Sequence, residues 1–214
     1  MRFEAITWQR MAERLAGHLD DTPAPTGWQR VGIDGAPAAD TGVLAGHLAE
    51  ELRLRSRPTL VVAAEGFLRP ASLRFEFGRE DVDSYLGGWY DTAALWREVF
   101  GPTDPGGTGR VLPDLWDPAT DRATRSPYVE LPPGGVLIVH GPLLLGHWFP
   151  FDLSVHIRLS AGALARRTEE SARWTLPAFA RYEADTDPGS GADAVVRADD
   201  PRHPAWTGLP RSAR

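Results

Sequence analysis

Residues 31–45 have the residue types and the order of a phosphate-binding loop. An apolar run leads into a loop of small residues and then into a helix-like run, whose N-terminal backbone N–H groups would face an anion. Laid on Gly35, the pattern G-x-x-x-x-G-K-[ST] finds Thr41 in place of the lysine and Gly42 in place of the Mg²⁺-binding hydroxyl. The loop residues are Gly35, Ala36, Pro37, Ala38, Ala39, Asp40, Thr41 and Gly42. The scaffold is present without its chemical groups, and an ordinary turn between strand and helix is the alternative.

A carboxylate follows the next predicted strand. Residues 59–64 form a continuous apolar run, as expected for a parallel strand that is buried on both faces. Glu65 comes directly after this run. Ligands of open α/β sheets bind beyond the carboxyl ends of the strands, so Glu65 occupies a position suited to chemistry. A solvated loop carboxylate is the alternative interpretation.

The composition limits the classes of function. The chain has 214 residues, a net charge of −6 and no basic run, which argues against nucleic acid as a partner. It has no cysteine, which excludes a thiol nucleophile and a Cys-ligated metal, and no lysine that could replace the one absent from the loop. No apolar run reaches about 18 residues, so we expect a cytoplasmic protein without a membrane partner.

The remaining chain supplies the elements that must hold these residues. Apolar spacing predicts an N-terminal helix over residues 5–19, a strand over 29–34 and a helix over 41–55. Further strands are expected at 136–140, 152–159 and 192–197, with helices at 92–99, 143–148, 161–171 and 175–184. Strands at 110–116 and 124–131 form a hairpin insertion within about 108–131. This alternation predicts a three-layer α/β fold with a mainly parallel sheet of about five strands. We expect one domain over 1–200 and a poorly ordered C-terminal tail over 201–214.

Several spaced motifs across residues 28–200 resemble the uridine kinase family of P-loop kinases. Residues 33–37 are similar to the family's strand and loop opening, and residues 62–67 to its strand with a D-x-F motif. The other matching segments are 77–85 (acidic segment), 116–122 (base-side hairpin), 139–143 (strand ending in an acidic residue and glycine), and 164–167, 176–179 and 192–196 (C-terminal part). The chain also resembles an actinobacterial branch of that family in which the degenerate loop without lysine recurs.

The resemblance implies a reaction and a set of site residues. In that family ATP, with Mg²⁺, donates its γ-phosphoryl group to the 5′-hydroxyl of a pyrimidine ribonucleoside. The catalytic aspartate position is Glu65 here, and the acidic position near the metal is His140. The implied substrate-binding residues are Arg79, Asp81, Asp83, Tyr85, Trp116 and Arg122, with Trp89 as a further wall. Trp116 would stack on a base. The alternatives are that Trp116 is a core residue of the hairpin, that the two aspartates cap a helix, and that the two arginines are solvated.

Two further departures concern phosphate charge. The family's arginine-bearing lid would lie between Arg166 and residue 176, but the short segment there holds only Arg173 beyond the flanking pair. The Asp40 carboxylate would repel a triphosphate by roughly 4 kcal/mol at about 4 Å, so we expect Asp40 to cap the following helix instead. The histidines lack a third ligand at metal spacing, and we expect no protein-built metal site.

Three functions remain open from the sequence. The first is a uridine kinase-like protein that binds a nucleoside or nucleotide, with ATP-dependent phosphoryl transfer impaired or lost. The second is an active nucleoside kinase of the uridine or cytidine type, which would need ATP and Mg²⁺ as cofactors. The third is a protein-interaction module that uses only the scaffold and has no small ligand or cofactor. The oligomeric state cannot be read from these residues.

Overall fold

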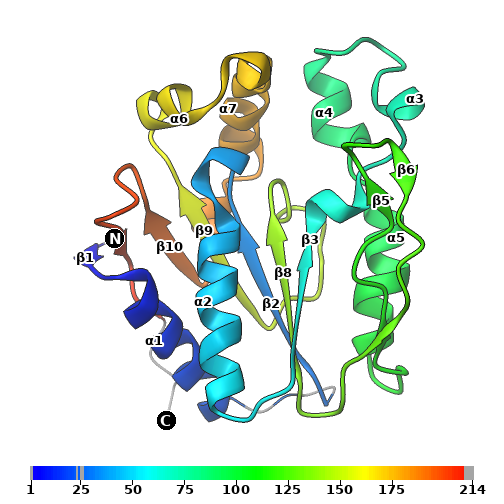
Figure 1. The fold of residues 1–214 in the computed structure, drawn as a ribbon. Coiled ribbons are helices and arrows are strands. Elements are labelled where there is room, and N and C mark those ends of the chain that lie inside the picture. The colour runs from blue at the N-terminus through cyan, green and yellow to red at the C-terminus, as the bar shows by residue number, and fades with distance from the viewer. Residues whose placement is uncertain (1, 23, 25–26, 210–214) are drawn as a thin grey trace.

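A seven-stranded sheet forms the centre of the molecule (Figure 1). The computed structural model describes residues 2–22, 24 and 27–209. In spatial order the strands are β1 (Glu4–Ala5), β11 (Ala205–Trp206), β10 (Ala194–Arg197), β9 (Leu153–Arg158), β2 (Gln29–Asp34), β8 (Val136–Gly141) and β3 (Thr59–Ala63). The strands from β10 to β3 are parallel to one another, and β11 is antiparallel to both of its neighbours. The predicted parallel sheet of about five strands is confirmed, and two short antiparallel strands extend it.

Helices and a hairpin cover the two faces of the sheet. Val136 and Ile138 of β8 pack in one apolar cluster with helices α1 (Trp8–Asp21) and α2 (Thr41–Leu54). Leu137 and Val139 point the other way and pack against α5 (Thr92–Leu95). Because successive side chains of a strand alternate between faces, an unbroken apolar run buries both sides at once. The remaining helices are α3 (Ala71–Arg74), α4 (Val82–Gly88), α6 (Ala161–Arg167), α7 (Leu176–Asp185) and α8 (Pro188–Gly191).

The N-terminal helix starts later than predicted. Thr7 is extended, and its hydroxyl accepts a hydrogen bond from the backbone N–H of Arg10 at 3.1 Å, which fixes the start of α1 at Trp8. The preceding residues form β1, which pairs with β11. The predicted start at residue 5 is therefore wrong, because strand pairing with the far end of the chain competes with the helix.

The C-terminal segment is not a free tail. Trp206 is fully buried in β11, and its indole N–H donates to Glu4 Oε1 at 2.8 Å. The expectation of poor order is wrong for residues 201–209, because a large aromatic side chain gains more from burial than the Pro/Arg-rich composition suggests. Residues 210–214 lie outside the described part of the chain.

The predicted hairpin is present but its ladder is interrupted. β4 (Arg110–Val111) pairs with β7 (Val129–Glu130), and β5 (Trp116–Asp117) pairs with β6 (Arg122–Ala123). The predicted strands at 110–116 and 124–131 are therefore wrong in length. Pro113 and Pro127 lie in the gaps, where a residue without an N–H cannot continue a ladder.

Three local predictions in the C-terminal half also need correction. Residues 143–148 form turns rather than a helix, and Leu143 and Trp148 have φ values of 60° and 57°, outside the helical region. The helix predicted over 161–171 ends at Arg167, and a 3₁₀ segment, Glu170–Thr175, precedes α7. Residues 188–191, expected as a loop, form the short helix α8.

Among the residues that the structure describes, no helix is long and apolar enough to cross a membrane.

Candidate functional site

Three strand ends bring the predicted chemistry together at one edge of the sheet. β2 runs into the loop at residues 35–42, β3 runs into Glu65, and β8 ends at His140 and Gly141. β8 lies between β2 and β3, and Ala63 is paired in register with His140. The Glu65 carboxylate lies so close to the Gly141 backbone that a Cβ there would stand 3.1 Å from Oε2. Glu65 and His140, separated by 75 positions in the sequence, therefore share one site.

The loop is closed by its own backbone. Pro37–Ala39 form a 3₁₀ turn, in which the N–H of Ala39 donates to Ala36 O at 2.7 Å and that of Asp40 to Pro37 O at 3.1 Å. Asp40 has a left-handed conformation with φ 55°. Its side chain makes no capping hydrogen bond to α2, so the prediction that the Asp40 carboxylate caps this helix is wrong. These N–H groups are satisfied within the loop, and neither is free to bind phosphate.

A neutral pair occupies the lysine position. The Thr41 hydroxyl and His140 Nδ1 lie 3.1 Å apart, and the Thr41 residue is buried. Burial lowers the pKa of His140, with the nearby Asp40 charge acting in the opposite direction. His140 is therefore uncharged near neutral pH. The pair supplies no cation to bind a phosphate group. It also supplies no carboxylate to bind a metal ion.

Glu65 is an acid in an apolar environment. It lies in the 3₁₀ turn Ala64–Phe67 and is partly buried. Burial raises the pKa of its carboxyl group, and a backbone hydrogen bond opposes the shift only in part. The side chain acts electrostatically on the phenols of Tyr85 and Tyr90. A buried carboxyl group with a raised pKa is suited to taking a proton from a substrate hydroxyl.

An aromatic cleft of about 470 Å³ opens beside the loop. Pro37 and Ala38 form its loop side, and most of the rest comes from α4 and the residue after it, α6, the segment before α7, and α7 itself. The rings of Tyr85 and Trp89 have centroids 5.0 Å apart, and those of Trp89 and Trp174 are 5.3 Å apart. We call this space the aromatic cleft; its aromatic lining residues are Tyr85, Trp89, Tyr90, Trp174 and Phe179. The rings contact one another in edge-to-face and tilted arrangements, so they form one continuous aromatic wall of the cleft.

Several predicted substrate residues lie outside this cleft. Asp81 caps α4 by accepting from Ser84 N at 2.7 Å, and that backbone contact lowers the pKa of its carboxyl group. Asp83 is exposed and pairs with Arg181. Both aspartates line a second cavity of about 490 Å³. The Arg79 guanidinium lies over the Phe75 ring, 5.1 Å from its centroid. Of the predicted set, Tyr85 and Trp89 line the aromatic cleft.

Trp116 and Arg122, the two predicted substrate residues of the hairpin, lie in the paired strands β5 and β6. The Trp116 indole N–H donates to Asp121 Oδ1 at 3.0 Å, and Arg122 is exposed. The hairpin packs against the turn that carries Glu65, because Leu115 N donates to Gly66 O at 2.8 Å. Trp116 is thus near the site, although it does not line the aromatic cleft.

The arginines of the shortened lid differ in whether they line the aromatic cleft, which the sequence did not indicate. Arg166 and Arg173 are exposed and do not line the aromatic cleft. Arg167 lines it instead, and its Nη1 donates to Ala198 O at 2.9 Å. The neighbouring 3₁₀ segment delivers Trp174, which the sequence analysis missed. The one local signal for this role of Trp174 was its place in the segment where the family's lid would lie.

A buried chain of charged groups anchors the base of the loop. His156 Nδ1 donates to Asp34 Oδ2 at 2.7 Å, and Nε2 donates to Glu183 Oε1 at 2.9 Å. Burial alone would lower the pKa of His156, but the hydrogen bonds and charges of the two carboxylates raise it to about 9. Asp34 Oδ1 also accepts from Leu144 N at 2.8 Å. Asp34 is completely buried and precedes Gly35, so this network holds the root of the loop.

The residues present do not fit a bound ATP–Mg²⁺ complex of the usual kind. The metal's hydroxyl ligand is replaced by Gly42, and the acidic residue at the end of β8 by His140. Among the described residues, no group of three or more His, Asp or Glu side chains is arranged to hold a metal ion.

Comparison with solved structures identifies the fold. A possible uridine kinase from Bacillus stearothermophilus superposes with a TM-score of 0.70 and 20% identity, over 86% of this chain and 96% of that chain. A candidate fructose transport system kinase from Silicibacter sp. TM1040 has a TM-score of 0.62 and 23% identity, over 87% and 95%. D-glycerate 3-kinase from Cryptococcus neoformans has a TM-score of 0.52 and 15% identity, over 83% and 80%.

The sequence comparisons add no family. No protein-family model matches the chain, and no curated protein matches it. At these identities the structural matches establish the fold, which is that of the P-loop kinases.

Proposed function

We propose that this protein is a uridine kinase-like protein that binds a nucleoside or nucleotide and has impaired or lost ATP-dependent phosphoryl transfer. The observation that carries the proposal is the Thr41–His140 pair, 3.1 Å apart, at the position of the phosphate-binding lysine. Phosphoryl transfer depends on positioning and on neutralising phosphate charge, so a site without this cation and with a metal-ligand position replaced loses the main source of rate.

The charge balance at the loop supports this conclusion. Asp40 Oδ1 lies 3.7 Å from where a Gly42 Cβ would stand, so a carboxylate faces the start of α2. A phosphate oxygen at about 4 Å from it would be repelled by roughly 4 kcal/mol at an effective dielectric near 20. The helix N-terminus offers only about 0.3–1 kcal/mol of opposing attraction. Triphosphate binding is therefore unfavourable at this loop.

The aromatic cleft supports the binding half of the proposal. Its volume of about 470 Å³ falls in the usual range for small-molecule sites. Stacking of a base on an aromatic side chain contributes roughly 1–3 kcal/mol. An open, aromatic-lined cleft also weighs against the interaction module, which would leave this space without a use. The fold neighbours include a possible uridine kinase and a D-glycerate 3-kinase, and a nucleoside is a hydroxylated small molecule of the same kind.

One observation favours the alternative, an active nucleoside kinase. Glu65 lies at the end of β3, in the position of the family's catalytic carboxylate, and burial raises its pKa. A base with this property could accept the proton of a 5′-hydroxyl. If the kinase is active, ATP and Mg²⁺ are its cofactors and both must be held by groups other than Thr41 and Gly42.

A thermal-shift panel separates these functions. The purified protein is heated with ATP, GTP, uridine, cytidine or UMP, each with and without Mg²⁺. A ligand at about 100 times its dissociation constant adds roughly 2.7 kcal/mol, or about 5–10 °C for a domain of this size. We expect a shift with uridine, cytidine or UMP that does not need Mg²⁺. A Mg²⁺-dependent shift with ATP would instead indicate the active kinase, and no shift with any of them would favour the interaction module.

A further inference from the structure

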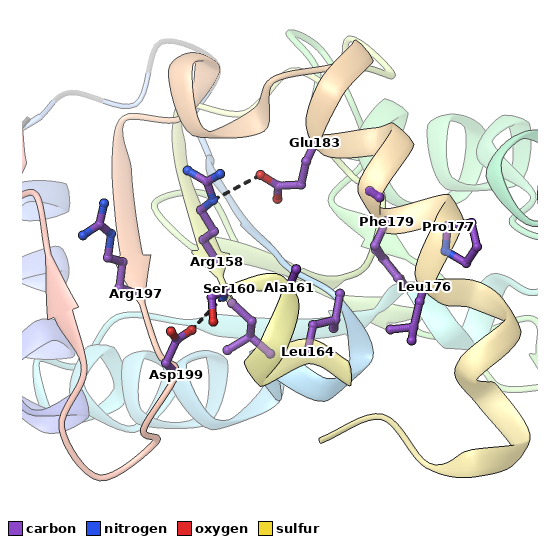
Figure 2. A pocket seen from close by; sticks show the side chains of 12 residues that line it. Arg158, Ser160, Ala161, Leu164, Leu176, Pro177, Phe179, Glu183, Arg197 and Asp199 are labelled. Carbon is purple, nitrogen blue, oxygen red and sulfur yellow. Dashed lines mark hydrogen bonds and ion pairs between the residues drawn. The ribbon is translucent and has the colours of Figure 1, made fainter. Parts of the chain in front are cut away.

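A cavity of about 770 Å³ lies away from the phosphate loop, at the carboxyl ends of β9 and β10. Helices α6 and α7 form its other side (Figure 2). None of residues 34–42, Glu65 or His140 lines it. It touches the aromatic cleft only through Leu164 and Phe179, which line both spaces. The function proposed above makes no use of this cavity.

The sheet register places two arginines side by side at this cavity. Arg158 of β9 and Arg197 of β10 are paired neighbours in parallel strands. Val155 and Ile157 face the α1–α2 side, so the alternation of the strand directs Arg158 to the opposite face, and Arg197 follows it by register. Figure 2 shows both arginine side chains on the strand side of the cavity. Like charges on directly paired residues repel each other.

The cavity's own carboxylates leave much of this positive charge available. Glu183 Oε1 accepts from His156, and Oε2 lies 3.3 Å from Arg158 Nε, so both oxygens are engaged. Asp199 accepts a hydrogen bond from Ser160 N at 2.7 Å. In the described part of the chain, the terminal nitrogens of Arg158 make no hydrogen bond, and the Arg197 side chain makes no hydrogen bond or ion pair, although its charge acts on the nearby Asp199 carboxylate. The Arg197 guanidinium lies over the Phe3 ring, 4.0 Å from its centroid.

The wall opposite the arginines is apolar. It is formed by the side chains of Leu164, Leu176, Pro177 and Phe179 (Figure 2). A ligand that fits both sides needs an apolar body for this wall and an anionic head for the arginine pair. Guanidinium groups bind carboxylates and phosphates through paired N–H donors.

We propose that the cavity between β9, β10, α6 and α7 is a separate binding site for an amphipathic organic anion, with Arg158 and Arg197 holding its head group. The apolar body lies on Leu164, Leu176 and Phe179. The site is independent of the phosphate loop, so the proposal stands whether or not the chain binds a nucleoside.

Isothermal titration calorimetry with octanoate tests this site, with octanol as the uncharged probe and acetate as the anion without an apolar body. We expect octanoate to bind, and octanol and acetate to bind at least about tenfold more weakly. Arg197→Gln should weaken octanoate binding about tenfold, because it removes charge-assisted hydrogen bonds without releasing a carboxylate. Arg53→Gln is the matched control, since Arg53 is an exposed arginine on α2 outside the cavity.

A second variant tests the location without touching the charges. Ala180 lines the cavity and is exposed, so Ala180→Trp should fill the space and abolish octanoate binding while the thermal midpoint stays within about 2 °C. Three results would overturn the proposal: no octanoate binding by the wild-type protein, octanol binding as tight as octanoate binding, or unchanged affinity in Arg197→Gln. Displacement of octanoate by ATP would also overturn it, because the cavity would then belong to a nucleotide site.

Discussion

The phosphate loop and the aromatic cleft lie next to each other but differ in how far they are prepared for a ligand. In the loop, backbone N–H groups donate to loop carbonyls and a Thr41–His140 pair fills the lysine position. In the cleft, aromatic rings enclose about 470 Å³ of open space, with Glu65 in an apolar environment nearby. The same fold therefore holds a loop that is closed on itself beside an open aromatic cleft. Under the proposed function, these are the phosphoryl-donor side and the acceptor side.

The largest effect is expected from the network that holds the root of the loop. His156→Ala leaves the buried Asp34 carboxylate without its cation, and breaking a buried pair in this way costs about 3–5 kcal/mol. We expect the thermal midpoint to fall by roughly 10 °C. Asp83→Asn is the control, because that carboxylate is in an exposed pair and its removal should cost almost nothing. Equal effects of the two variants would show that the network does not anchor the loop.

The same network makes the stability of the wild-type protein dependent on pH. The pKa of His156 is about 9 in the folded protein, above the unfolded value of 6.5, so folding favours the protonated ring. Its contribution is complete below pH 6.5 and is lost as the pH rises through about 9, a decrease of roughly 3 kcal/mol. Urea unfolding between pH 6 and 10 measures this. A His156→Gln variant should lack the decrease, and a decrease that persists in it would assign the effect to other groups.

Restoring the missing groups tests whether the loop alone distinguishes the two regions. Thr41→Lys, Gly42→Thr and His140→Asp together supply the cation, the hydroxyl and the carboxylate; replacing His140 also removes the ring atom that lies 3.4 Å from a Cβ at position 42. We expect Mg²⁺–ATP to raise the thermal midpoint by roughly 5 °C in this variant only. The control replaces the lysine by glutamine at position 41. If ATP still fails to bind, the shortened lid or the loop backbone is the limiting feature.

Two tryptophans identify where the ligand stacks. If the aromatic cleft binds the base, Trp174→Ala should weaken uridine binding about tenfold, and Trp116→Ala should change it less than twofold. The opposite result would place the base at the hairpin, as the sequence resemblance implied. Calorimetry measures both affinities, and thermal unfolding of each variant checks that the fold is intact.

The smallest effect concerns Glu65. Its pKa is raised in the folded protein, so folding favours the protonated form, and the contribution is complete below pH 4.5 and lost as the pH rises through the folded value. Glu65→Gln should therefore stabilise the protein at pH 7 by less than about 1 kcal/mol and have no effect at pH 4. If the protein is an active kinase, the same variant should abolish turnover. A loss of stability at pH 7 would mean that the ionised carboxylate has a partner in the fold.

The sequence by itself determined the framework and the departures at the loop. The apolar run at 136–140 predicted a strand, which the structure has at Val136–Gly141, because burial on both faces imposes a local pattern that can be read without the rest of the chain. The residue types at Thr41, Gly42 and His140 were also readable from the sequence, and their interpretation as replacements in a phosphate-binding site stays a prediction.

Only the tertiary structure decided which side chains meet. Asp34 and His156 are 122 positions apart, and Glu183 joins them from α7. Arg167 rather than Arg166 lines the cleft, and Trp206 is buried in β11 although its segment reads as a tail. These outcomes depend on how distant elements pack, and local periodicity carries no information about the rotation or the partner of each element.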